Sequence, residues 1–138
     1  MLQRGWEEMS KVRIALIGTG NIAHSHVQRL LQMTEVEVVA LADPSEENRK
    51  RMKQRFELNH AAEFTDHAEM LAQIKPDAVV ICSPHAMHYR HAMDALEAGS
   101  HVLVEKPLTC TSVAAKELIQ HAAKAGKILQ VSYQRHFL

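Results

Sequence analysis

The sequence has few cysteines, few aromatic residues and no excess of charge of either sign. Its 138 residues include two cysteines, Cys82 and Cys110, and aromatic residues make up 4% of the chain. Two cysteines do not make a disulfide framework, so we expect a reducing, cytoplasmic setting. Basic and acidic residues balance at 16 each. Because a neutral chain has no net attraction for polyanions, neither nucleic acid nor an anionic membrane is expected as a partner.

Long apolar runs are also missing from the sequence. No stretch approaches the roughly 20 apolar residues that a membrane-spanning helix needs. Residues 1–10 contain Glu7 and Glu8 and lack the apolar core of a secretory signal. We interpret residues 1–10 as a loose N-terminal extension. Residues 11–138 are then expected to form one domain, for which a hydrophobic content of 46% is sufficient.

Short apolar runs alternate with longer amphipathic segments along this domain. Runs rich in β-branched residues predict strands at residues 12–17, 37–42, 61–64, 78–82, 101–104 and 128–131. Helices are predicted at 21–33, 66–74, 85–98 and 111–125, and a further helix opens at Pro44-Ser45 and includes the basic run at 49–55. Strands that alternate with helices are typical of an α/β protein with a parallel sheet. We therefore expect a doubly wound Rossmann sheet with strand order 3-2-1-4-5-6.

A glycine-rich loop connects the first predicted strand to the first predicted helix, and it reads Gly18-Thr19-Gly20-Asn21-Ile22-Ala23. Gly18 permits a tight turn, and Gly20 lets the backbone approach a pyrophosphate. Ala23 is small enough for the helix to pack against the strand. Free amides at a helix N-terminus bind phosphates, so residues 18–22 are predicted to hold a dinucleotide. The alternative is a glycine-rich turn without a ligand.

An acidic residue follows the second predicted strand, 25 positions after Gly18. A carboxylate at Asp43 can accept both ribose hydroxyls of the adenosine and would repel a 2′-phosphate. The next residue is Pro44 rather than an arginine that could hold such a phosphate. The sequence therefore predicts NAD over NADP. Asp43 could equally cap the following helix, and the two roles are compatible.

The fifth predicted strand ends in Glu105-Lys106-Pro107. Two charged residues cannot continue a buried strand, so they are expected at its carboxyl end, where open α/β sheets bind ligands. Pro107 holds Lys106 in an extended conformation. Taken alone, Lys106 would be interpreted as a solvated loop lysine.

These motifs together resemble those of a known family. The loop, Asp43, Ser83-Pro84 with His88, the run Ala98-Gly99-x-His101-Val102 and Glu105-Lys106-Pro107-Leu108 resemble the N-terminal domain of the glucose–fructose oxidoreductase/inositol dehydrogenase (Gfo/Idh/MocA) family. The ending, Tyr133-Gln134-Arg135-His136-Phe137, is similar to the segment that leads into the second domain of those proteins. The resemblance covers about residues 11–138.

The resemblance implies an NAD(P)-dependent oxidoreductase that acts on sugars, inositols or related polyols. Lys106 would be the catalytic residue, which contacts the substrate hydroxyl and helps to move its proton. Glu105, Ser83 and Pro84 would line the nicotinamide ribose. The family usually has asparagine where this chain has His85. We assign His85 and His88 to the cofactor site with these residues.

Members of the family continue into a second α/β domain, which supplies the substrate pocket and much of the oligomer interface. This sequence ends at Leu138, where that domain would begin. It is expected to be either a fragment or a stand-alone domain that binds cofactor without full activity. The substrate would bind through the missing domain, and an uncovered apolar surface could support a homo-oligomer. The alternative is a non-catalytic dinucleotide-binding sensor or partner module.

Ten histidines raise the question of a metal site. His85, His88 and His91 are spaced three apart, but no cysteine or carboxylate completes a ligand set, so no metal is expected. His24 and His26 follow the glycine-rich loop and are expected on the surface of the first helix.

Overall fold

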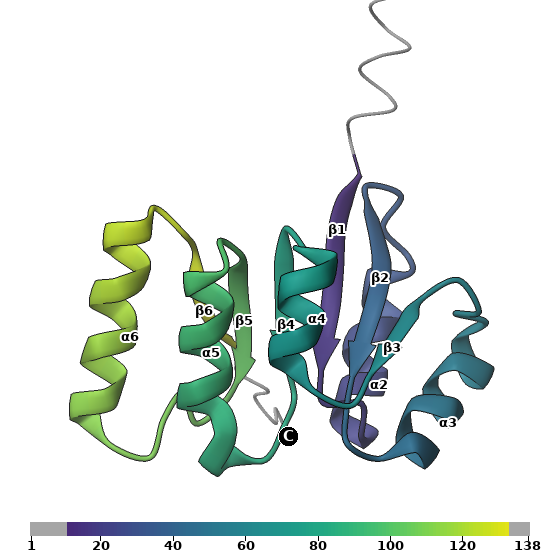
Figure 1. The fold of residues 1–138 in the computed structure, drawn as a ribbon, viewed down its shortest axis with the longest axis horizontal. Coiled ribbons are helices and arrows are strands. Elements are labelled where there is room, and N and C mark those ends of the chain that lie inside the picture. Colours follow the sequence, from purple (N-terminus) through teal and green to yellow (C-terminus); the bar gives the residue numbers. More distant parts are fainter. Residues whose placement is uncertain (1–10, 133–138) are drawn as a thin grey trace, which may run out of the picture.

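A computed structural model describes residues 11–132, and these form a six-stranded parallel sheet with helices on both faces (Figure 1). The strand order is β3-β2-β1-β4-β5-β6, so the predicted doubly wound order is confirmed. The strands are β1 (Val12–Ile17), β2 (Val36–Ala42), β3 (Ala62–Phe64), β4 (Ala78–Ile81), β5 (His101–Glu105) and β6 (Leu129–Ser132). The helices are α2 (Asn21–Leu30), α3 (Glu46–Phe56), α4 (His67–Ile74), α5 (His88–Glu97) and α6 (Ser112–Ala125), with a 3₁₀ turn η1 (His85–Met87).

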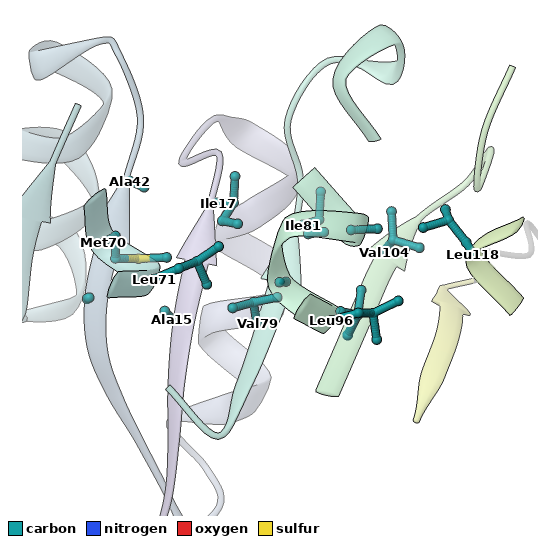
Figure 2. Close-up of a cluster of buried hydrophobic side chains, with 14 of the residues drawn as sticks. Ala15, Ile17, Ala42, Met70, Leu71, Val79, Ile81, Leu96, Val104 and Leu118 are labelled. Atoms are coloured by element: carbon teal, nitrogen blue, oxygen red, sulfur yellow. The ribbon is translucent and has the colours of Figure 1, made fainter. Parts of the chain in front are cut away.

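The hydrophobic core lies in two layers, one on each face of the sheet. On one face, α4, α5 and α6 pack against the sheet (Figure 1). Figure 2 shows Met70 beside Ala42, Leu96 near Val79, and Leu118 beside Val104. On the other face, α2 and α3 bury Val27 and other apolar residues against the sheet. Because both faces are covered, β4 is apolar throughout and β1 is apolar from Ile14 to Ile17, as expected for central strands of a parallel sheet.

Polar side chains and backbone bonds set the ends of the helices. Ser45 caps α3 by accepting from the Asn48 amide, and Thr111 caps α6 in the same way. The segment predicted as one helix over 85–98 begins instead with the 3₁₀ turn η1, in which the Met87 amide donates to the Pro84 carbonyl at 2.9 Å. An α-helical bond from the same amide would go to the Ser83 carbonyl, which is contacted instead by the His88 ring.

The sheet register brings the ends of four strands to one edge. Ile17 pairs with Ala42 of β2 and with Ile81 of β4, and Ile81 pairs with Val104 of β5. The loops that follow these strands therefore meet at the carboxyl edge of the sheet, where ligands bind in open α/β folds.

Two of the predictions fall outside the described residues, namely the extension at 1–10 and the family-like ending at 133–137. Between residues 11 and 132, none of the helices is both long enough and apolar enough to cross a bilayer.

Candidate functional site

Gly18 makes the turn that follows β1, and no other residue would fit there. Its φ angle is +94°, and a Cβ atom would lie 2.6 Å from the Cys82 carbonyl carbon and the Ser83 nitrogen. Those are backbone atoms of the loop after β4, which cannot rotate away. Gly18 is therefore required for the two loops to pack, as the sequence predicted for a tight turn.

Gly20 has the opposite environment. It precedes α2 with φ of −76°, and a Cβ atom there would meet nothing within 4 Å. No side chain caps α2 at this point. The first amides of a helix have no acceptor within the helix, and they lie at the positive end of its dipole. Asn21 and Ile22 in this first turn are exposed. This end of α2 is therefore open to an anion.

Asp43 lies beside this loop, at the end of β2. Its Oδ2 accepts two hydrogen bonds from Thr19, one from the amide at 2.8 Å and one from the hydroxyl at 2.9 Å. Its Oδ1 accepts the Ser45 amide at 2.8 Å. The carboxylate is therefore held in place between the glycine-rich loop and the start of α3. The helix cap itself is Ser45, so the Asp43 side chain supports the cap rather than forming it.

The basic side chain that contacts Asp43 is already paired with a carboxylate, and so is a lysine on the same helix. Arg49 is buried, donates to the Asp43 carbonyl, and contacts Glu63 Oε1 at 3.1 Å. Lys53 contacts the other oxygen of Glu63 at 3.1 Å. Burial acts to raise the pKa of Glu63, but the hydrogen bonds from Lys53 and Arg49 outweigh it and lower the pKa overall. These two cations thus have a carboxylate partner within the protein.

A second group of predicted residues follows β4. Pro84 and His85 are exposed at the carboxyl edge, and the Ser83 hydroxyl lies 2.7 Å from His91 Nδ1. Burial, followed by the charge of the adjacent His67, lowers the pKa of His91 to about 4. His91 is therefore uncharged near neutral pH and fixes the Ser83 hydroxyl by a hydrogen bond without adding charge.

The Glu105-Lys106-Pro107 segment completes the edge. Lys106 is exposed, whereas Glu105 is only 7% exposed and lies against His26 of α2, with 2.5 Å between Oε1 and Nε2. The Lys106–Pro107 peptide bond is cis. Burial, followed by the charge of Glu105, raises the pKa of the nearby Cys82 thiol to about 12.

His88 lies beneath these two loops rather than on their surface. It is completely buried, with Nδ1 at 2.7 Å from the Pro107 carbonyl and Nε2 at 2.9 Å from the Ser83 carbonyl. The ring of exposed His85 lies 5.4 Å away, centroid to centroid. The two ring nitrogens of His88 thus contact backbone carbonyls of the candidate site.

The expectation that His24 and His26 lie on the surface of the first helix is wrong. Both are buried, at 6% and 5% exposure, because α2 packs against other elements on more than one side. His24 Nδ1 lies 3.0 Å from an Arg55 nitrogen, and burial together with Arg55 lowers its pKa. A signal for His26 was present in the sequence, since it shares helical spacing with buried Ala23 and Val27.

The structure therefore gathers most of the predicted site at one edge of the sheet. The glycine-rich loop, Asp43, Ser83 and Lys106 all follow strands that end there. No cluster of three or more histidine, cysteine or acidic residues suited to a metal occurs within the described part of the chain.

Comparisons with known proteins agree with this geometry. A family model described as "Oxidoreductase family, NAD-binding Rossmann fold" matches residues 12–133. D-glucoside 3-dehydrogenase of Escherichia coli (strain K12) is 35% identical over 129 residues, which make up 93% of this chain and 36% of that enzyme. The chain thus spans little more than a third of the length of this relative.

Solved structures show the same fold. Scyllo-inositol dehydrogenase from Lactobacillus casei, with bound NAD(H) and scyllo-inositol, matches with a TM-score of 0.80 and 25% identity, over 88% of this chain and 36% of that one. Biliverdin reductase from a Synechocystis species, with biliverdin and NADP⁺, matches with a TM-score of 0.81 and 28% identity, over 88% of this chain and 37% of that one. The solved neighbours thus include complexes with either dinucleotide.

Proposed function

The chain belongs to the Gfo/Idh/MocA oxidoreductase family with an NAD-binding Rossmann fold, and on this premise we propose that it is the cofactor domain of an NAD-dependent dehydrogenase. The substrate class that we propose is a sugar, an inositol or a related polyol. One observation carries the proposal: the open N-terminus of α2 at Gly20 lies beside a fixed carboxylate, Asp43.

The residues present fit a dinucleotide. The first amides of α2, from Gly20 to Ile22, would donate to the pyrophosphate, because they have no acceptor within the helix. The open space at Gly20 lets a phosphate approach the backbone. Asp43 would accept the hydroxyls of the adenosine ribose. Ser83, Pro84 and His85 would lie along the other half of the cofactor, at the end of β4.

Asp43 also supports NAD over NADP. A carboxylate held beside the ribose would repel a 2′-phosphate, and its position is fixed by three hydrogen bonds from Thr19 and Ser45. Arg49, which contacts the Asp43 backbone, is paired with Glu63, as is Lys53 of the same helix, and this pairing reduces their capacity to offset that repulsion.

Lys106 is the residue that we propose for catalysis. The bound dinucleotide supplies hydride transfer, and Lys106 would hydrogen-bond the substrate hydroxyl and help to move its proton. Lys106 is exposed at the carboxyl edge, where a substrate would approach the cofactor. Glu105, the preceding residue, lies buried beneath it and would contribute to the wall of the nicotinamide site.

The chain by itself is proposed to bind cofactor without full turnover. The chain covers only 36% of the length of relatives such as D-glucoside 3-dehydrogenase, and a second domain would supply the substrate pocket. A cytoplasmic setting and self-association through a surface that such a domain would cover belong to the same proposal.

A titration of the 138-residue chain with NAD⁺, NADP⁺ and ADP-ribose tests the cofactor proposal. We expect NAD⁺ to bind at least about tenfold more tightly than NADP⁺, which corresponds to about 1.4 kcal/mol. Asp43→Asn should reduce that preference, because it removes the negative charge but keeps the shape. Tighter binding of NADP⁺ would refute the assignment, and no binding of any of the three would refute a cofactor domain. Transfer of hydride when a second domain is supplied would separate the dehydrogenase from a non-catalytic sensor.

A further inference from the structure

Two buried histidines from different helices hold the residues on either side of Lys106. His26 of α2 contacts the side chain of Glu105, and His88 of α5 contacts the carbonyl of Pro107. We propose that His26 and His88 are positioning residues, which fix Lys106 at the carboxyl edge of the sheet. The part of this proposal that concerns the cofactor depends on the function proposed above.

His88 contacts both the loop after β4 and the loop after β5. Its ring is completely buried, and its two nitrogens lie 2.9 Å and 2.7 Å from the carbonyls of Ser83 and Pro107. A flat ring with nitrogens on two sides can contact both loops at once, and a neutral imidazole donates through one of the two nitrogens. The ring thus sets the separation of the two loops.

His26 joins the same segment to α2, the helix that follows the glycine-rich loop. Its Nε2 lies 2.5 Å from Glu105 Oε1, and the two residues are 5% and 7% exposed. A buried carboxylate is costly without a hydrogen-bonded partner, so Glu105 depends on this contact to stay in place. His26 lies on α2, less than two turns after Gly20, where the phosphates are proposed to bind. One rigid helix thus connects the phosphate end of the site to the residue before Lys106.

The two contacts act on Lys106 in different ways. Glu105 is fixed through its side chain and Pro107 through its backbone, so the backbone of residue 106 is held from both sides. The Lys106 side chain itself is exposed at the edge. A catalytic lysine must lie within hydrogen-bond reach of the hydroxyl it serves, and small displacements are costly to rate. A fixed backbone restricts where its ammonium group can go.

The position of Lys106 can be followed by NMR after its amine is labelled. The lysines of the 138-residue chain are dimethylated with ¹³C-formaldehyde, and Lys106→Arg identifies the signal of Lys106. His88→Leu removes both carbonyl contacts. His88→Asn keeps a donor near the Nδ1 position, toward Pro107, and His88→Gln keeps one near the Nε2 position, toward Ser83. His26→Leu and His26→Gln form the matching pair at α2, because glutamine retains a donor near the Nε2 position.

Without cofactor, both leucine variants are expected to move the Lys106 signal away from its wild-type position. His88→Asn and His26→Gln should return it to within a quarter of that displacement, whereas His88→Gln should leave it displaced. The control is His60→Ala, at an exposed histidine just before β3 and hence at the opposite edge of the sheet. It should leave the signal unchanged. A wild-type Lys106 signal in a folded His88→Leu or His26→Leu chain would overturn the proposed role of that histidine.

If the leucine variants fail to fold, the asparagine and glutamine variants still test the positioning role. A displaced signal in His88→Gln with a wild-type signal in His88→Asn supports the proposal, and identical signals in the two overturn the role of the Pro107 contact. When NAD⁺ is added, the Lys106 signal of the wild-type chain is expected to shift. In His88→Leu this shift should be at most half as large, whereas the affinity for ADP-ribose should change less than threefold. If the wild-type chain binds no NAD⁺, the proposed function fails, and the measurements without cofactor still decide the positioning role.

Discussion

Gly18 and Gly20 lie two residues apart in one loop, yet alanine at each position is expected to act through different physics. At Gly18, a new Cβ atom would lie 2.6 Å from two backbone atoms of the β4 loop, and the φ angle is +94°. The left-handed conformation costs an alanine roughly 1–2 kcal/mol. Overpacking in a rigid site adds typically about 1–3 kcal/mol. Together, Gly18→Ala should lower the free energy of unfolding by about 2–5 kcal/mol.

At Gly20, the same methyl group meets nothing within 4 Å and the φ angle is negative. The cost to stability is that of a poorer helix cap, at most about 1 kcal/mol. The methyl group would nevertheless occupy the space through which a pyrophosphate approaches the backbone. Gly20→Ala should therefore fold normally and bind NADH at least about tenfold more weakly, a loss of about 1.4 kcal/mol.

The assay combines urea unfolding with a fluorescence titration of NADH on each variant. Gly126→Ala is the matched control, because this glycine also has a positive φ of +68° but ends α6, away from the carboxyl edge. It should lose stability, by about 1 kcal/mol, without losing affinity. Wild-type affinity in Gly20→Ala would refute the view that the pyrophosphate lies against Gly20. Wild-type stability in Gly18→Ala would refute the packing argument for the loop.

Three further predictions concern groups outside this loop. The pKa of the Cys82 thiol is raised to about 12, so Cys82 should not react with Ellman's reagent in the folded chain, whereas exposed Cys110 should react at once. Equal reaction rates at the two cysteines would contradict the burial of the Cys82 thiol. The pKa of His91 is lowered from 6.5 to about 4 in the folded chain. Between these two pH values the unfolded chain binds a proton at this histidine that the folded chain does not bind. The free energy of unfolding should therefore be highest above pH 6.5 and fall as the pH decreases below it. Urea unfolding should show the protein roughly 2 kcal/mol less stable at about pH 5 than at about pH 7, and His91→Asn should flatten that slope. Leu118→Ala, at a completely buried core position, should cost about 3 kcal/mol in the same measurement, and a loss below about 1 kcal/mol would mean that α6 is loosely packed.

Much of the fold could be predicted because the signals are local. Each buried strand is a short apolar run, and each helix has apolar residues on one side, so the alternation could be recognised without long-range information. Right-handed crossovers then leave few strand orders, and the observed order is the expected one. Gly18 and Asp43 could be found for the same reason, since each follows a strand directly.

The contacts beneath the site could not be predicted in the same way. His26 and Glu105 are 79 residues apart in sequence, and His88 and Pro107 are 19 apart, so neither pairing has a local signature. The surface assignment of His26 was wrong because a polar residue was assumed to face water. Its place on the apolar side of α2 would have favoured burial, although only the fold identifies Glu105 as its partner.

The three hydrogen bonds to Asp43 have a consequence for how the cofactor preference could evolve or be engineered. The carboxylate that would discriminate between the two dinucleotides also accepts from Thr19 and from the residue that caps α3. A swap to a smaller neutral residue would leave those donors without their acceptor, so it would weaken the fold while relaxing selectivity. A change in the preference between NAD and NADP is therefore expected to depend on more than one position. Compensating substitutions at positions 19 and 45 should precede or accompany the change at position 43.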